Sequence, residues 1–126
     1  MDFEIFRTGP VQKSTDRLHA TINERGHIFL NRRVLEAMGQ PDAVTLMYDR
    51  GRRIIGIRPT TLSRAHGFIL KKKDNTNSRG RMIYAMNFCR HYKITPTETL
   101  AFISPTINKD GILMLNLNEM LSAKKM

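Results

Sequence analysis

The 126-residue chain carries 21 Lys and Arg against 11 Asp and Glu residues, a formal net charge of +10 at pH 7. This length fits one domain or two very small ones, and 40% hydrophobic against 25% charged residues favours a folded over a disordered chain. A single cysteine excludes an internal disulfide. No apolar run reaches membrane length and no signal-peptide pattern is present, which predicts a cytoplasmic protein with no membrane partner.

The positive charge favours a polyanionic partner, because Lys and Arg residues that dock on phosphates release condensed counterions. Both halves are basic: residues 1–62 hold ten Lys and Arg against seven Asp and Glu, and residues 63–126 hold eleven against four. The alternative is a basic surface that only keeps the chain soluble. On charge we favour nucleic acid.

Residues 18–61 form the first predicted unit, after a lead-in over residues 1–17. Alternating apolar residues predict a strand over 18–22, and an apolar run predicts a second strand over 27–30. The two strands together have the pattern of a hairpin. Gly26 lies in the connecting turn, where a glycine can adopt positive φ without steric cost.

A short helix is predicted over residues 32–38. Asn31 is a favourable N-cap, because its side chain can accept a hydrogen bond from a free backbone N–H, and Gly39 suits the left-handed position after a helix. So short a helix is not stable alone in water, so its apolar face must dock on the sheet. Residues 44–48 and 53–58 then predict a second hairpin.

A second unit is predicted over residues 80–118, after a linker over 62–79 that leads into it through a strand; residues 119–126 form a basic tail. The segment Asn77-Ser-Arg-Gly-Arg81 matches Asn23-Glu-Arg-Gly-His27. The apolar positions behind it match as well: Met82, Ile83 and Tyr84 fall on Ile28, Phe29 and Leu30, and Phe88, Cys89 and Tyr92 fall on Val34, Leu35 and Met38. We interpret this as one structural unit used twice.

The sequence Gly26-His-Ile-Phe-Leu-Asn-Arg-Arg-Val-Leu-Glu-Ala-Met-Gly39, with the hairpin that follows it, resembles the AbrB/MazE/MraZ-like (SpoVT/AbrB-type) swapped-hairpin family. Residues 18–59 follow the family's order closely, and residues 67–117 follow it more loosely. The resemblance implies a mainly β fold with short helices, in which two β-β-α-β-β units interleave their hairpins into one small β-barrel. Two tandem units in one chain would form such a barrel alone, as a pseudo-dimer.

The resemblance also implies function. Members of the family bind DNA as transcription regulators or as antitoxins, so we expect a DNA-binding transcriptional regulator, cytoplasmic and associated with the nucleoid. The basic residue that follows the turn glycine in the family corresponds to His27 and Arg81. The arginine pair late in the family's first helix is absent, and this chain has Arg32 and Arg33 one turn earlier. The fold therefore transfers better than the DNA contacts.

If the two glycine turns lie on one face, their neighbours form a distributed cationic surface that contacts duplex DNA. Arginine suits this role, because its planar fork can straddle a phosphate or the edge of guanine. The predicted nucleic-acid-binding residues are Arg25, His27, Arg32, Arg33, Arg79, Arg81 and Arg90, with Lys71, Lys72 and Lys73 as a phosphate-binding arm. A second basic group is expected on the opposite edge, at Arg50, Arg52, Arg53 and Arg58.

Catalytic patterns are missing from the sequence. The four histidines have no metal-ligand spacing, and neither a carboxylate pair nor a glycine-rich phosphate loop occurs. We therefore predict no enzyme, no metal and no cofactor, and we assign Cys89 and the three tyrosines to the core rather than to a base-stacking platform. The alternative function is a protein-interaction module, antitoxin-like or oligomer-forming (a dimer or larger), whose basic face binds a partner protein or RNA.

Overall fold

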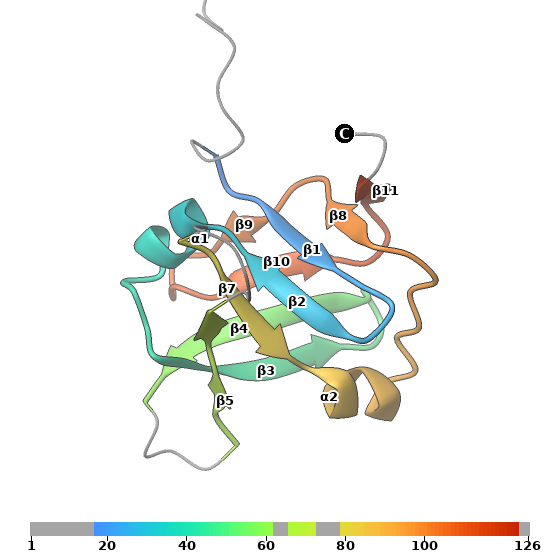
Figure 1. The fold of residues 1–126 in the computed structure, drawn as a ribbon, viewed down its shortest axis with the longest axis horizontal. Helices are drawn as coiled ribbons and strands as arrows, with labels where there is room; N and C mark the ends of the chain where they lie inside the picture. Colours follow the sequence, from blue (N-terminus) through green and yellow to red (C-terminus); the bar gives the residue numbers. More distant parts are fainter. Residues whose placement is uncertain (1–16, 62–65, 73–78, 124–126) are drawn as a thin grey trace, which may run out of the picture.

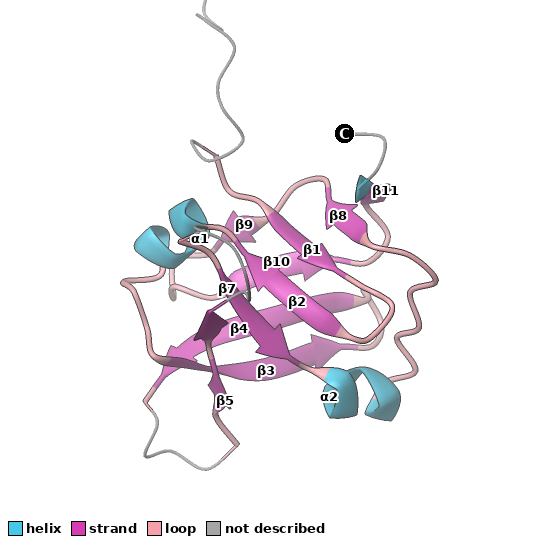
Figure 2. Cartoon of the chain, in the orientation of Figure 1, coloured by secondary structure: helices cyan, strands magenta, loops and turns pink. Residues whose placement is uncertain are grey.

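The computed structural model describes residues 17–61, 66–72 and 79–123. These residues form two antiparallel sheets and two short helices (Figures 1 and 2), which confirms the predicted mainly β class. Most of the predicted lead-in, residues 1–16, lies outside the described residues, and so does Lys73 of the predicted arm.

The first sheet has six strands in the order β11-β8-β1-β2-β7-β6. Its strands are β1 (Ala20–Ile22), β2 (His27–Leu30), β6 (Lys71–Lys72), β7 (Arg81–Tyr84), β8 (Leu100–Phe102) and β11 (Met120–Ser122). The sequence assigned residues 120–122 to a tail, but they pair with β8 and form an edge of this sheet.

The second sheet has five strands in the order β5-β3-β4-β10-β9. Its strands are β3 (Ala43–Asp49), β4 (Ile54–Thr60), β5 (Phe68–Ile69), β9 (Thr106–Ile107) and β10 (Leu113–Asn116). Within the described residues both sheets end in edge strands, so the closed β-barrel that we expected is not found. Two sheets facing each other replace it.

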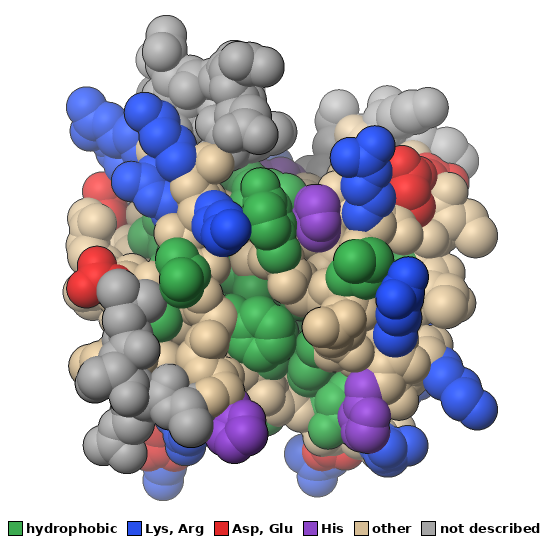
Figure 3. All heavy atoms as spheres, turned by 60° about the horizontal axis from the view of Figure 1, so that its bottom comes forward, with side chains coloured by type: hydrophobic (Ala, Val, Ile, Leu, Met, Phe, Trp, Pro, Cys, Tyr) green, Lys and Arg blue, Asp and Glu red, His purple; other side chains and the backbone are tan. Residues whose placement is uncertain are grey.

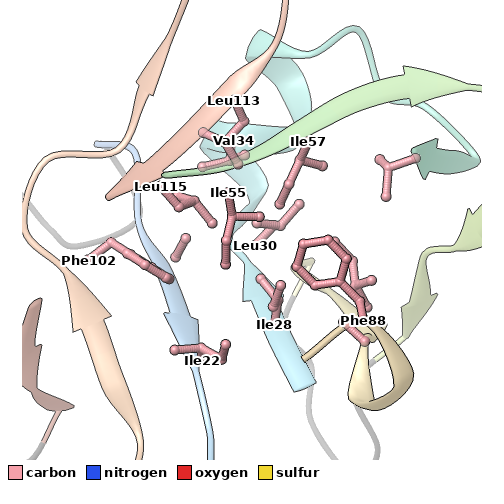
Figure 4. Close-up of a cluster of buried hydrophobic side chains, with 14 of the residues drawn as sticks. Ile22, Ile28, Leu30, Val34, Ile55, Ile57, Phe88, Phe102, Leu113 and Leu115 are labelled. Carbon is pink, nitrogen blue, oxygen red and sulfur yellow. The ribbon is translucent and has the colours of Figure 1, made fainter. Parts of the chain in front are cut away.

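The hydrophobic core lies between the two sheets (Figure 4). Alternate residues of a strand point to opposite faces, so one side of each strand supplies the core. Ile22 and Ile28 from the first sheet meet Ile55 and Leu113 from the second, and all four are fully buried. Burying apolar side chains of this size supplies about 1.5–3 kcal/mol each.

Strand pairs join the two halves of the chain. In the first sheet β2 pairs with β7 and β1 pairs with β8; in the second, β4 pairs with β10 and β3 pairs with β5. In each of these four pairs one strand precedes residue 62 and the other follows it. Neither half therefore builds a sheet from its own strands alone.

The two helices are α1 (Arg32–Ala37) and α2 (Met86–His91). The predicted cap of α1 is confirmed: Asn31 Oδ1 accepts a hydrogen bond from the backbone N–H of Val34 at 3.0 Å. Gly39 follows α1 with φ of 85°. Ala85 stands at the equivalent position before α2 and offers no side-chain hydrogen bond, so packing and a backbone hydrogen bond from Ala85 to Gly26 hold the start of that helix.

The strand register decides which residues of β2 and β7 face the core. The repeat placed Met82 on Ile28 and Ile83 on Phe29. Across the strands Ile28 is paired with Ile83, and both side chains are fully buried. Phe29 is paired with Met82, and both are only half-buried. Of the matched positions Ile28 is fully buried and Met82 is half-buried, so the two strands do not turn matching residues toward the core.

Candidate nucleic-acid interface

The antiparallel pair β2–β7 forms the centre of the predicted basic surface, and we call it the central ribbon. His27 is paired with Tyr84 at one end and Leu30 with Arg81 at the other. Gly26 precedes His27 and Gly80 precedes Arg81, so the two glycine turns lie at opposite ends of the ribbon and not side by side. The predicted cations consequently separate into two groups.

The first end of the ribbon is anchored on α2. The Asn23 side chain accepts hydrogen bonds from the backbone N–H groups of Arg25 and His27, each at 3.0 Å. The Gly26 carbonyl accepts a hydrogen bond from the Ala85 N–H at 3.1 Å. The turn that contains the exposed Arg25 is therefore bonded to the start of α2, the helix that contains the exposed Arg90.

Arg50 extends this end of the ribbon. Its guanidinium carbon lies 4.9 Å from the centre of the Tyr92 ring, directly after α2. The sequence grouped Arg50 with the second hairpin and expected it on the opposite edge. The β3–β4 turn instead brings it to the helix of Arg90. A basic residue stacked on a partly buried tyrosine gains a cation–π attraction.

The second end of the ribbon holds Arg79 and Arg81. The Arg81 Nη1 donates hydrogen bonds to the carbonyl oxygens of Arg79 at 3.2 Å and of Gly80 at 2.9 Å. Arg81 pairs with the inward-facing Leu30 and is itself half-buried. Both arginines line a small pocket of about 160 Å³, together with Leu35, Gln40, Pro41, Asp42 and Leu70.

The cations of α1 are already paired. Arg32 Nε lies 3.2 Å from one carboxylate oxygen of Glu36, and Arg33 Nη1 lies 3.9 Å from the other. Both arginines and Glu36 remain partly exposed, so water screens these ion pairs. Glu36 therefore lowers the positive potential at two of the predicted nucleic-acid-binding residues.

The outward side of the central ribbon is aromatic at its first end. The rings of His27 and Tyr84 are stacked with centroids 4.5 Å apart, and Lys71 Nζ lies 4.9 Å from the centre of the Tyr84 ring. Tyr84 is 43% exposed, whereas we assigned it to the core. The error follows from the strand register, which turns Tyr84 outward together with its partner His27. Lys72 is exposed on the same edge strand.

Burial shifts the pKa of two titratable groups in the described part of the chain. Burial lowers the pKa of His19, with a smaller contribution from the neighbouring charge of Arg17. Burial raises the pKa of Cys89 to about 11, and the side chain is 3% exposed, which fits the predicted role of buried filler. Among residues 17–61, 66–72 and 79–123, no three His, Cys, Asp or Glu side chains gather as metal ligands would.

A second hollow lies at the β8–β11 edge of the first sheet. It has a volume of about 350 Å³ and is lined by Arg17, Leu18, His19, Ala101, Phe102, Ile103 and Leu121. Ile103 and Leu121 are 54% and 49% exposed. This edge groove is mostly apolar, unlike the polar pocket at Arg79 and Arg81.

Comparisons with known proteins identify no relative: no family model, no curated protein and no solved structure matches this chain. Nor is any helix in the described part of the chain long and apolar enough to cross a membrane. The resemblance to the swapped-hairpin family therefore rests on the residues quoted above.

Proposed function

We propose that this protein is a transcription regulator that binds duplex DNA through a basic surface to which both halves contribute. The observation that carries the proposal is the pairing of β2 with β7, one strand from each half, with cations at both ends of the pair. Arg25 and Arg90 stand at the first end, and Arg79 and Arg81 at the second.

The spacing of the two ends suits a duplex. Four residues of antiparallel strand span about 10 Å, and the major groove of B-DNA is about 12 Å wide. Because β1 and β6 flank the ribbon, the sheet would lie across the groove rather than enter it. Cations at the two ends would then reach phosphates on the two sides of the groove, contacts that position a protein without reading sequence.

The proposal also concerns how the two halves of the chain are related. We infer that the halves are two swapped-hairpin units that form a pseudo-dimer within one chain. The reciprocal strand pairing supports this: β1 of the first half adds to β8 of the second, and β5 adds to β3 of the first. The ribbon that joins the halves, β2–β7, has a counterpart in the antiparallel pair β4–β10 of the second sheet.

A salt titration of binding to random duplex DNA tests this function. In a gel-shift assay we expect the protein to retard the duplex at low salt. The affinity should fall steeply as salt rises, because each phosphate contact releases counterions. The double variant Arg79→Ala/Arg81→Ala should weaken binding and reduce the slope of log affinity against log salt by about 2. The matched control, Arg52→Ala/Arg58→Ala, removes the same charge from exposed positions around β4 and should change the slope less.

No retardation of duplex DNA at low salt would reject the proposal, and equal slopes for the two double variants would reject the assignment of the site. Because the Arg81 side chain bonds backbone carbonyls, both variants should first be shown to unfold at temperatures close to that of the wild type.

The edge groove favours a second candidate function, a protein-interaction module. Ile103 and Leu121 expose large apolar side chains beside the open edge strand β11. Exposed strand edges invite pairing with another chain. Light scattering that shows a discrete oligomer, together with duplex binding that stays absent at low salt, would favour this candidate over the first.

A further inference from the structure

The outward side of the central ribbon is unusual for an antiparallel sheet. Such a sheet commonly packs one face on the core and turns polar residues to water on the other. Here the outward positions are His27 and Phe29 on β2 and Met82 and Tyr84 on β7. None of the four is an aliphatic core residue, and none is a simple charged surface residue. Packing explains Phe29, whose ring lies over Gly80, but it does not explain the stacked pair of His27 and the exposed Tyr84.

The described helices leave this face uncovered. In Figure 1, α1 and α2 stand at the two ends of β2 and β7 rather than over the face turned to the viewer. Figure 3, in which the bottom of Figure 1 comes forward, shows hydrophobic side chains along the middle of that side of the molecule, with Lys and Arg side chains gathered at a corner and along the edges.

The exposed tyrosine of the ribbon differs from the other aromatic residues. Tyr48, Phe88 and Tyr92 contact one another, with ring centroids 4.8 to 6.3 Å apart, and all three pack against the core. Tyr84 belongs to no such cluster. Its described ring neighbours are His27, stacked on it at 26°, and the ammonium group of Lys71. A packing role explains the first group but not Tyr84.

We propose that His27 and Tyr84 form a stacking site for an unpaired base, with Lys71 as the contact to the adjoining phosphate. This inference rests on the proposed function, because it assumes that the chain binds nucleic acid, and it names single-stranded DNA or RNA as a ligand of the same surface. Aromatic rings on a positively charged surface are the usual platform for single strands, since every base offers a flat face. In a duplex those faces are already stacked on each other.

The position of Lys71 allows its ammonium group to exchange the Tyr84 ring for a phosphate as its partner. Lys71 belongs to a two-residue edge strand, is exposed, and lies over the Tyr84 ring. A base that stacks on Tyr84 takes the position of the ammonium group, which can then pair with the phosphate of the same nucleotide. Arg25 is exposed two residues before His27 and extends the positive surface for neighbouring phosphates.

Fluorescence anisotropy with four labelled probes of one length tests this site. The probes are an oligothymidylate of about twelve nucleotides, within the range of known single-strand site sizes, the matching oligouridylate, an abasic strand, and a duplex. At equal low salt we expect the oligothymidylate to bind the wild-type protein at least about tenfold more tightly than the abasic strand. The uridylate probe decides between DNA and RNA as the preferred strand.

Variants of Tyr84 assign the effect to the ring. Tyr84→Leu should lower the affinity for the oligothymidylate about tenfold and leave the abasic strand and the duplex unchanged. Tyr84→Phe keeps the ring and should bind nearly as the wild type does. Lys71→Gln should weaken all charged probes and lower the salt slope by about one phosphate contact.

The outcomes separate the two proposals. If the duplex binds but the wild-type protein does not prefer the oligothymidylate to the abasic strand, the stacking site is overturned and the proposed function stands. If single strands bind with the expected preference and the duplex does not, the stacking site stands and duplex recognition fails. If no probe binds at low salt, both proposals fail.

Discussion

Gly26 and Cys89 are 63 residues apart in the sequence, yet the Sγ atom of Cys89 lies 3.9 Å from the carbonyl oxygen of Gly26. The contact packs the β1–β2 turn of the first half against helix α2 of the second half. It has this geometry because Gly26 adopts φ of 77° and has no Cβ, so the turn backbone can approach α2 closely. The first end of the central ribbon depends on this approach.

Gly26→Ala should therefore destabilise the protein for two reasons. A Cβ at this position would lie 3.0 Å from the Cα of Met86, a backbone atom that cannot move alone, and the left-handed φ is unfavourable for alanine. We expect a loss of about 2–4 kcal/mol in the free energy of unfolding, measured by urea denaturation. Gly39→Ala is the control, because Gly39 has φ of 85° with no neighbour within 4 Å. It should lose only the backbone part, about 1 kcal/mol; equal losses would show that the close approach carries no cost.

Asn31 ties α1 to the residues before β1. Its Oδ1 accepts hydrogen bonds from the N–H groups of Val34 and His19, and its Nδ2 donates to the Arg17 carbonyl at 2.7 Å. Asn31→Ala should lose about 2–3 kcal/mol of stability, because a helix cap is removed and buried backbone groups are left without a partner.

Asn108→Ala provides the comparison for Asn31. The Asn108 side chain also accepts hydrogen bonds from two backbone N–H groups, those of Asp110 and Ile112, but it is exposed, so water can replace it. Its loss should stay below about 1 kcal/mol. A chemical denaturation series on both variants measures the difference, and similar losses would contradict the argument from burial.

Cys89 should make stability depend on alkaline pH. Burial raises the pKa of its thiol from the ordinary 9.0 to about 11 in the folded protein. Above pH 9 the unfolded chain therefore releases a proton that the folded chain keeps. The stabilising contribution is complete below pH 9 and is lost as pH rises toward 11. The wild type should lose more stability over this interval than Cys89→Ala, in which lysine and tyrosine titration is unchanged; parallel curves would contradict the shift.

Local structure could be predicted from the sequence because its causes are local. The cap at Asn31 and the left-handed turns at Gly26 and Gly39 depend on the chemistry of one residue and its next few neighbours. Helix α1 lies where the apolar spacing predicted it and ends one residue before its predicted last residue, and α2 forms at the positions matched to α1 in the repeat. The predicted pattern also gave the right apolar pairs on the helices, since Val34 and Phe88 are both buried.

Strand register could not be predicted, because it depends on a partner far along the chain. In the segment Arg81-Met-Ile-Tyr84, three apolar residues follow one another, so the pattern allows either face to be the core. Pairing with β2 determines which face of β7 is buried, because it places Ile83 opposite the buried Ile28. The consequences for the candidate site are large: Tyr84 turns outward, and Arg81 turns toward the pocket beside α1.

Glu36 limits the positive potential of α1, because its carboxylate lies 3.2 Å from Arg32 and 3.9 Å from Arg33. If α1 contributes to a nucleic-acid surface, Glu36→Gln frees both guanidinium groups and should tighten duplex binding several-fold at low salt, with a steeper salt slope. Stability should hardly change, because the ion pairs are partly exposed. Glu119→Gln makes the same change of net charge at an exposed residue between β10 and β11. In anisotropy titrations Glu36→Gln should gain clearly more affinity than Glu119→Gln; equal gains would mean that only net charge matters and that α1 lies outside the interface.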